Sequence, residues 1–330
     1  MQSQTATVSN DHTEIRVKGK TVHVPSVQIE GRTVIATGKW LKMAAFRDED
    51  MMEGGTLTDP ESFISQLKQT QLNADIFTFA QKLPDTAPKY GYHVTWENFA
   101  VIPITKASDW WEKQVEPSVR RAVRKATKSG VTVTPVAFDD ALVEGIVSIN
   151  NETPIRQGKP FWHFQKSFNA VKDENSTYKD RNTFLGAYYE GELIGFVRLT
   201  RTDRVANIVQ LLTKMKHFDK RPANALVAKA VEVCEQSKIT HLMYCNYTYN
   251  DPDSSLTEFK RRNGFQKVDL PRYYIPLSIK GEIALRLGLH RGLAQRVPKP
   301  LLHQLLRLRS RWYAHRLKNE TSKPDEEPAA

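Results

Sequence analysis

The strongest constraint on the fold is a regular alternation of strand-like and helix-like segments between residues 131 and 277. Short runs rich in β-branched residues alternate with amphipathic stretches of helical spacing, and turn residues separate them. This order predicts an α/β domain in which helices cover the sheet whose strands they connect. The expected elements are strands 131–136, 206–213 and 241–247, a hairpin 183–200, helices 139–150, 164–174, 223–235 and 255–262, and closing strands up to Leu277.

The residues before this domain predict a smaller region of strands and helices. Apolar and polar residues alternate on both sides of Gly19 and Gly31, which favours two β-hairpins. Asp59 is suited to cap a helix that begins at Pro60. The expected elements are hairpins 14–25 and 27–37, helices 40–52 and one from Pro60, strands 75–80 and 90–104, and a long basic helix from Ser108 to Gly130.

We therefore expect three parts along the chain. Residues 1–105 form the strand and helix region, residues 106–280 form the α/β domain, and residues 281–330 form a basic helical tail with a disordered end. The composition agrees with folded protein, since 40% of the residues are hydrophobic and 26% are charged.

The first residues of the chain and its cysteines indicate a cellular compartment. Residues 1–14 are polar and lack the features of a signal peptide, and no apolar run approaches the roughly 18 residues of a membrane span. Both cysteines, Cys234 and Cys245, fall in regular segments, which fits buried free thiols in a reducing compartment. We expect a cytoplasmic protein.

The net charge of +11 is concentrated near the end of the chain. Between residues 283 and 318 there are nine Lys and Arg residues and no acidic one, with leucines at nearly helical spacing. This pattern predicts a cationic amphipathic helix that attaches the protein peripherally to an anionic membrane surface on its inner face. Nucleic acid is an alternative partner, and docking of the leucine face on the protein's own core is another.

The sequence lacks the motifs that are typical of several common classes of enzyme. The chain has no GxxxxGK[ST], GxGxxG, CxxC, HExxH or GxSxG motif. Its nine histidines are scattered, and none has a second histidine or a cysteine at metal-ligand spacing. We therefore expect no metal site.

Three motifs within the α/β region carry a family resemblance. They are the hairpin 186–197 with its Gly195-Phe196 step, the basic loop 217–226 that leads into a helix, and segment 254–265 with Lys260 before Gly264-Phe265. Together with the order of elements, they resemble the GNAT acyltransferase fold, a mixed sheet flanked by helices. The resemblance implies an enzyme that moves an acyl group from acyl-CoA to an amine.

A further motif resembles the FemAB-like and BioF2-like acyltransferases, which are similar to two GNAT units in tandem. Trp110-Trp111 is followed by a basic helix, in which Arg120, Arg124 and Lys128 recur every four residues and form one cationic face. The resemblance implies that residues 1–105 are a reduced first GNAT-like unit.

The resemblance also implies where the cofactor binds. In this family the diphosphate of coenzyme A lies at a helix N-terminus, which here follows Lys220. The sequence departs from the family pattern, since alanines replace two glycines and Pro222 has no N–H group. The implied acyl-CoA site comprises Lys220, Arg221, Ala223, Asn224 and Ala225, with a backbone N–H at Leu212 or Thr213 polarising the acyl carbonyl.

The acceptor site is expected at loop 150–163, which joins the first two helices of the domain. Glu152 or His163 would act as the base, and Arg156 and Lys159 would bind an acidic group of the acceptor. The alternative is that Glu152 pairs with Arg156 in a purely structural role. Tyr247 would line the opposite wall, and Lys260, which stands where many GNAT enzymes have a tyrosine acid, would donate a proton or bind phosphate.

Three hypotheses remain open from the sequence. The first is an N-acyltransferase that acts on a small-molecule or lipid-linked amine by direct attack, without a covalent enzyme intermediate. The second is a FemABX-like aminoacyltransferase that uses charged tRNA to modify a cell-envelope precursor. The third is an inactive GNAT-like module that binds a membrane or a partner.

Overall fold

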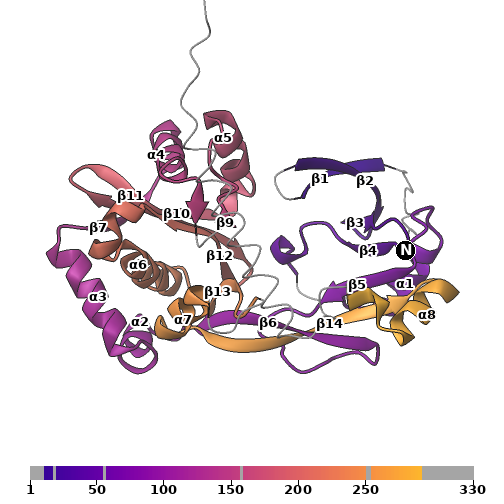
Figure 1. The fold of residues 1–330 in the computed structure, drawn as a ribbon. Coiled ribbons are helices and arrows are strands. Elements are labelled where there is room, and N and C mark those ends of the chain that lie inside the picture. The colour runs from indigo at the N-terminus through magenta and orange to yellow at the C-terminus, as the bar shows by residue number, and fades with distance from the viewer. Residues whose placement is uncertain (1–10, 18–19, 55–56, 157–158, 250–253, 292–330) are drawn as a thin grey trace, which may run out of the picture.

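One mixed sheet of twelve strands runs through the described part of the chain, residues 11–17, 20–54, 57–156, 159–249 and 254–291 of the computed structural model (Figure 1). The order across the sheet is β1-β2-β3-β4-β5-β14-β6-β13-β12-β11-β10-β7. Its strands are β1 (Asp11–Val17), β2 (Lys20–Ile29), β3 (Arg32–Thr37), β4 (Met43–Phe46), β5 (Ile76–Ala80), β6 (His93–Pro103), β7 (Thr132–Val136), β10 (Asn182–Tyr189), β11 (Glu192–Thr202), β12 (Val205–Thr213), β13 (His241–Asn246) and β14 (Gln266–Pro276).

Helices cover both ends of this sheet, and a short ribbon of β8 (Ile155–Arg156) and β9 (Lys159–Pro160) stands apart from it. The α-helices are α1 (Pro60–Lys68), α2 (Ala107–Asp109), α3 (Pro117–Lys128), α4 (Asp140–Asn150), α5 (Phe168–Ser176), α6 (Pro222–Gln236), α7 (Ser255–Arg262) and α8 (Ile279–Arg286). The shorter turns are η1 (Glu49–Met51), η2 (Trp110–Gln114), η3 (Lys179–Arg181), η4 (Met215–Lys220) and η5 (Leu289–Arg291). The architecture confirms the predicted mixed sheet flanked by helices.

The long strands β6 and β14 join the two halves of the molecule (Figure 1). They pair antiparallel from Gln266↔Val101 to Tyr274↔His93. The outer edge of β14 pairs with β5, and the outer edge of β6 pairs with β13. A strand from residues 1–105 therefore lies between two strands of residues 106–280, and the expected division of the chain stays a prediction.

Each half has its own apolar core. Helix α6 packs on one face of β10–β13, where Leu226 and Val231 are fully buried, and α4 covers the other face with Ile146 and Ile149. In the first half, aromatic rings including Phe77 and Tyr273 form a connected cluster beneath α1. The sheet therefore has protein packed on both faces at its β7 end.

Strands β12 and β13 pair only briefly. Their parallel ladder covers Val205–Asn207 against His241–Met243 and then ends. Six residues of β12, from Ile208 to Thr213, continue along β11 without a partner on the β13 side. The sheet thus opens between β12 and β13, at the end of the sheet near the first residue of α6.

Most predicted elements are confirmed, but the helix expected over 40–52 is wrong. Residues Met43–Phe46 form β4, which pairs antiparallel with β3 and parallel with β5, and only η1 follows. An apolar run of four residues cannot distinguish helix from strand by periodicity. Sheet pairing and the burial of Ala44 and Phe46 decide the outcome.

The long basic helix expected from Ser108 to Gly130 is interrupted. Helix α3 begins only at Pro117, whose ring excludes the preceding residue Glu116 from helical geometry, and Glu116 is extended with ψ 149°. Helix α5 likewise begins at Phe168 instead of Phe164, because the Ser167 hydroxyl accepts a hydrogen bond from the Ala170 N–H. Gly130 has the predicted left-handed conformation, with φ 84°.

The basic tail is described only at its start. Helix α8 and η5 form the described beginning of 281–330, and residues 292–330 lie outside the described part, so the predicted helix over 283–318 is mostly not covered. None of the described helices is long and apolar enough to cross a membrane.

Helix α8 packs closely on the first half through Gly281, and this contact is testable. A methyl group at Gly281 would lie 1.9 Å from the carbonyl oxygen of Asp75, so Gly281→Ala should lower the free energy of unfolding by about 1–3 kcal/mol. Urea unfolding measures this change. In the control Gly91→Ala, the methyl group meets nothing within 4 Å, and equal effects of both substitutions would contradict the packing described.

Candidate active site

The N-terminus of α6 is open to a ligand. Arg221 adopts the left-handed conformation with φ 61°, Pro222 takes the first helical position, and no side chain caps the helix. Because the first N–H groups of a helix have no partner within it, those of Ala223 and Asn224 are available at this end. The helix dipole makes the position favourable for an anion.

A groove of about 520 Å³ lies between the α6 N-terminus, α3 and α7. Arg121 and Lys125 project from α3 into its lining, both are exposed, and neither forms an ion pair with any other described residue. Arg221 and Arg262 add two further positive charges from the opposite walls. The groove is thus suited to a ligand with several negative charges.

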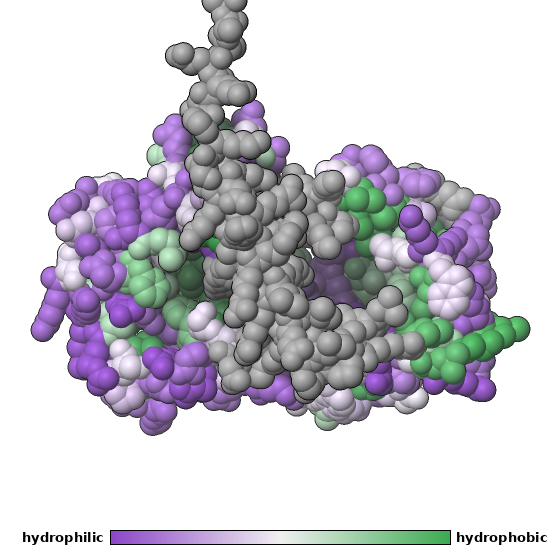
Figure 2. Space-filling view, viewed as in Figure 1, coloured by the Kyte–Doolittle hydropathy of each residue, from purple (hydrophilic) through white to green (hydrophobic). Residues whose placement is uncertain are grey.

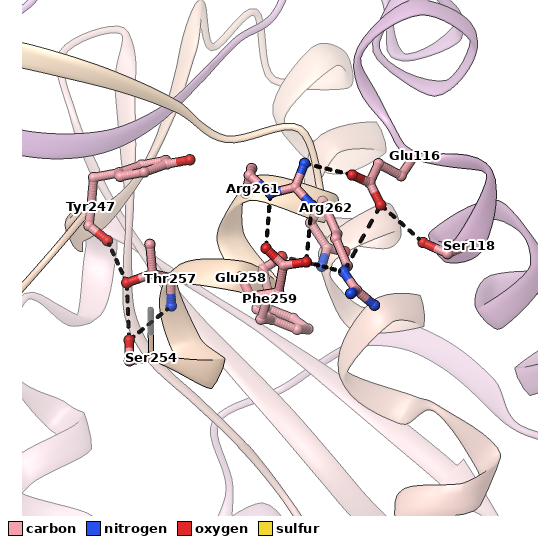
Figure 3. Close-up of polar contacts among 10 residues, drawn as sticks. Glu116, Ser118, Tyr247, Ser254, Thr257, Glu258, Phe259, Arg261 and Arg262 are labelled. Atoms are coloured by element: carbon pink, nitrogen blue, oxygen red, sulfur yellow. Dashed lines mark hydrogen bonds and ion pairs between the residues drawn. The ribbon is translucent and has the colours of Figure 1, made fainter. Parts of the chain in front are cut away.

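An ion-pair network fixes α7 against the start of α3 (Figure 3). Arg261 contacts both Glu258, at 2.8 Å, and Glu116, at 2.6 Å. Arg262 contacts Glu258 at 2.6 Å, and its carbonyl oxygen accepts a hydrogen bond from the Glu116 N–H. The network engages Arg261 and Arg262, so the groove cations without an ion pair to another described residue are Arg121 and Lys125 of α3, together with Arg221.

The cationic face expected on this helix differs from the one that lines the groove. Arg120 is half-buried and donates to the carbonyl oxygens of Trp111, Glu112 and Val115, which closes the break before α3. Arg121 and Lys125 face the groove instead. Both sets recur every four residues, so spacing alone could not tell which one meets a ligand.

The expected cofactor residues divide into two groups. Thr213, Arg221, Ala223 and Asn224 line the groove. Lys220 turns toward the ring of Tyr189, with its Nζ 4.7 Å from the ring centre. Ala225 is buried in the core, and the Leu212 side chain packs beside α4.

Lys260 is fully buried beside the opening between β12 and β13. Its Nζ donates to the carbonyl oxygen of Asn246 at 2.5 Å and lies 4.7 Å from the ring centre of Tyr244 and 5.0 Å from that of Tyr249. Burial lowers the pKa of Lys260 to about 8, although the Cys245 thiol opposes this effect. Lys260 can therefore change its protonation state near neutral pH.

Glu152 and Arg156 hold the loop after α4 against the end of β12. The Glu152 carboxylate accepts hydrogen bonds from the N–H groups of Met215 and Lys216, at 2.5 and 2.8 Å. Arg156 lies 3.5 Å from Glu152 and donates to the carbonyl oxygens of Ile149 and Thr213. Both side chains are engaged by protein groups, as in the alternative considered from the sequence.

His163 is buried between the same loop and β12. Its Nε2 lies 3.2 Å from the amide nitrogen of Gln210, and its ring centre lies 3.7 Å from that of Trp162. Burial, helped by Lys166 and Arg156, lowers the pKa of His163 to about 3. The imidazole is therefore neutral at physiological pH.

Lys159 and Tyr247 lie away from the groove. Lys159 is exposed on β9. Tyr247 donates its N–H to the Asn98 carbonyl oxygen, and its own carbonyl oxygen accepts from the Thr257 hydroxyl (Figure 3). The structure does not bring these two residues together with Lys260 in one cavity.

The structure has a second cavity, of about 830 Å³, that no sequence pattern predicted. It lies between the two halves and is lined from both, with Asp50 and Lys82 on one side and Thr202, Arg204 and Asn207 on the other. Residues so far apart in the chain carry no local signal of their meeting. Among the described residues, no group of three or more His, Cys, Asp or Glu side chains is placed to hold a metal ion.

Comparison with known proteins agrees with this geometry. Residues 147–265 match the model of the acetyltransferase (GNAT) family. No curated protein sequence matches the chain.

Two of the solved structures that the chain is similar to, FemX and a protein from Bacteroides thetaiotaomicron, share its fold at low sequence identity. FemX is 11% identical with a TM-score of 0.54, over 80% of this chain and 88% of FemX. A conserved protein of unknown function from Bacteroides thetaiotaomicron is 10% identical with a TM-score of 0.51, over 77% and 86%. L-PGS from Bacillus licheniformis is 13% identical with a TM-score of 0.49, over 78% and 85%. Residues 147–265 thus match the acetyltransferase (GNAT) family, and the chain shares its fold with FemX.

Proposed function

We propose that the protein is an N-acyltransferase that moves an acyl group from acyl-CoA to an amine by direct attack. The observation that carries this proposal is the groove at the open N-terminus of α6, which adjoins the separated ends of β12 and β13. A diphosphate at this helix end would accept hydrogen bonds from the Ala223 and Asn224 N–H groups. Arg121 and Lys125 would balance its charge.

The acyl end of the donor would extend between β12 and β13. Thr213 lines the groove, and β12 has no ladder partner on the β13 side from Ile208 onward. A backbone N–H at Leu212 or Thr213 would then polarise the thioester carbonyl and stabilise the charge of the transition state. Ala223 replaces the glycine typical of this loop, so the phosphates would approach the backbone less closely.

Lys260 would serve as the proton donor to the leaving thiolate. It is buried beside the gap, and its pKa of about 8 suits proton transfer near neutral pH. The predicted roles of Glu152 and His163 as bases, and of Arg156, Lys159 and Tyr247 in acceptor binding, stay predictions. Glu152 and Arg156 have a second role that the geometry supports, which is to position the end of β12.

A thermal-shift titration with acetyl-CoA, a long-chain acyl-CoA and free CoA tests the proposal. A ligand at 100 times its dissociation constant adds about 2.7 kcal/mol of stability. A shift that depends on the acyl chain supports a thioester donor. If no CoA compound shifts the midpoint but charged tRNA does, the aminoacyltransferase hypothesis replaces this proposal.

The described start of the tail supports the proposed attachment to an anionic membrane. Ile279, Ile283 and Leu287 recur every four residues, and 80, 52 and 64% of their respective surfaces are exposed. Hydrophobic side chains gather over α8 (Figure 2). A lipid-linked amine acceptor would suit such an attachment.

We predict that two α3 cations bind the donor. Arg121→Gln combined with Lys125→Gln should raise the dissociation constant of CoA at least about tenfold, since hydrogen bonds to charged groups contribute roughly 1.5–3 kcal/mol. Isothermal titration calorimetry measures this change. The control Arg124→Gln with Lys128→Gln removes the same charge from the same helix outside the groove, and equal losses in both double variants would contradict the assignment.

We predict that kcat falls as the pH rises through about 8, because neutral Lys260 cannot protonate the thiolate. Lys260→Met should lower kcat by about 10²–10⁴-fold and leave CoA binding within a factor of two. Steady-state release of CoA measures both effects. A flat profile between pH 7 and 9.5, with activity retained in the variant, would exclude Lys260 as the donor.

We predict that Ile279→Ser with Ile283→Ser weakens binding to vesicles rich in phosphatidylglycerol, because the apolar face of an interfacial helix supplies part of its affinity. Cosedimentation measures the bound fraction. Val22→Ser, which changes an exposed residue of the first hairpin, should have no effect. Unchanged binding of the double variant would contradict a membrane role for α8.

A further inference from the structure

The 830 Å³ cavity lies on the face of the sheet opposite α6. Ala206 and Leu242 pack in the core beneath α6, so their neighbours Asn207 and Met243 point to the other face, where they line the cavity. Asn207 and Met243 are also the last paired residues of β12 and β13. The cavity therefore adjoins the point where the two strands begin to separate.

One buried polar side chain in its lining has no partner within the described residues. Thr202 is 5% exposed, and its Oγ1 makes no hydrogen bond. Asn207, which is 7% exposed, adds a second polar side chain to the lining. An unsatisfied buried polar group is unfavourable, so Thr202 indicates that a polar ligand completes the cavity.

The charged groups of the lining divide into paired and unpaired ones. Most are already engaged: Lys89 with Asp85, Glu49 with Arg272, Asp203 with the Gly54 N–H, and Lys82 with the Met52 carbonyl oxygen. The Asp50 carboxylate and the Arg204 guanidinium form no ion pair or hydrogen bond with another described residue. One free anion and one free cation in a single cavity are complementary to a molecule that carries both charges.

Asp50 lines the same cavity as Asn207 and Met243, the last paired residues of β12 and β13. Burial raises the pKa of the Cys245 thiol, and the negative charge of Asp50 adds to this rise; the thiol lies 4.0 Å from the carbonyl oxygen of Ile208, the first residue of β12 beyond that pairing. The Asp50 side chain is open to the cavity, yet the surrounding protein desolvates it and raises its own pKa. Arg272 and Lys82 oppose that rise, while Glu97 and Asp48 add to it.

We propose that this cavity binds the acceptor, a primary amine that also carries a carboxylate, such as an amino acid or the backbone of a short peptide. Asp50 takes a proton from the acceptor's ammonium group, and Arg204 holds its carboxylate. Thr202 and Asn207 complete the polar contacts, and Leu57 and Leu270 supply apolar walls for the rest of the molecule. The inference rests on the proposed function and extends it to the class of acceptor.

The proposed step is balanced in atoms and charge. One ammonium proton passes to Asp50, and the neutral amine nitrogen attacks the thioester carbonyl carbon. The N–C bond forms and the C–S bond breaks, so the products are an amide and a thiolate. Lys260 protonates the thiolate and recovers a proton from the nitrogen, while Asp50 releases its proton to solvent.

Binding and transfer are measured separately to test this inference. The probes are dipeptides with apolar side chains and the same dipeptides as C-terminal amides, with acetyl-CoA as the donor and thiol release as the readout. The variants are Asp50→Asn and Arg204→Gln. The control Glu53→Gln removes a charge three residues from Asp50, outside the cavity lining, and thermal midpoints verify that each variant is folded.

The inference expects dipeptide acids to bind at least about tenfold tighter than their amides, and Arg204→Gln to abolish that preference. Asp50→Asn should lower kcat by about 10²–10⁴-fold with CoA binding unchanged, whereas Glu53→Gln behaves as the unmodified protein. If acids and amides bind equally, if no dipeptide binds, or if both variants retain full transfer, the inference is overturned. If dipeptides bind with the expected preference but no acyl-CoA binds, the proposed function fails and the cavity assignment stands.

Discussion

The antiparallel pairing of β6 with β14 is the interaction on which the rest of the structure depends. Because β14 also pairs with β5, and β6 with β13, these two strands make one sheet from two halves that each have their own core. The pairing places the loops of the first half, including η1, opposite the first residues of β12 and β13. The 830 Å³ cavity exists only because of this juxtaposition, so neither half could form it alone.

The opening between β12 and β13 lies between the sites proposed for the two substrates. On one side, the α6 N-terminus and the unpaired cations of α3 favour a polyanionic donor. On the other side, a cavity with one free carboxylate and one free guanidinium favours an amine acceptor. Lys260 is buried beside the opening, where a proton donor to the leaving group is needed. The two substrates would thus meet across the sheet.

The sequence was sufficient for most of the fold, and four residues expected at the cofactor site, Thr213, Arg221, Ala223 and Asn224, line one groove of the candidate site. Periodicity located α4, α6, α7 and the β10–β11 hairpin, and turn and cap residues marked their ends. It failed where tertiary pairing decided the outcome, as at β4, and where Pro117 divided a continuous basic pattern. Local patterns do not encode which of two equally spaced cationic faces lines the groove, or that Asp50 and Arg204 line one cavity, because both depend on how distant segments pack.

The central claim is that the groove at α6 holds the donor, and a crystal structure of the protein grown with CoA tests it most directly. The account predicts the diphosphate at the N–H groups of Ala223 and Asn224, within reach of Arg121 and Lys125, with the thiol directed between β12 and β13. A diphosphate bound elsewhere, or no CoA at millimolar concentration, would contradict it.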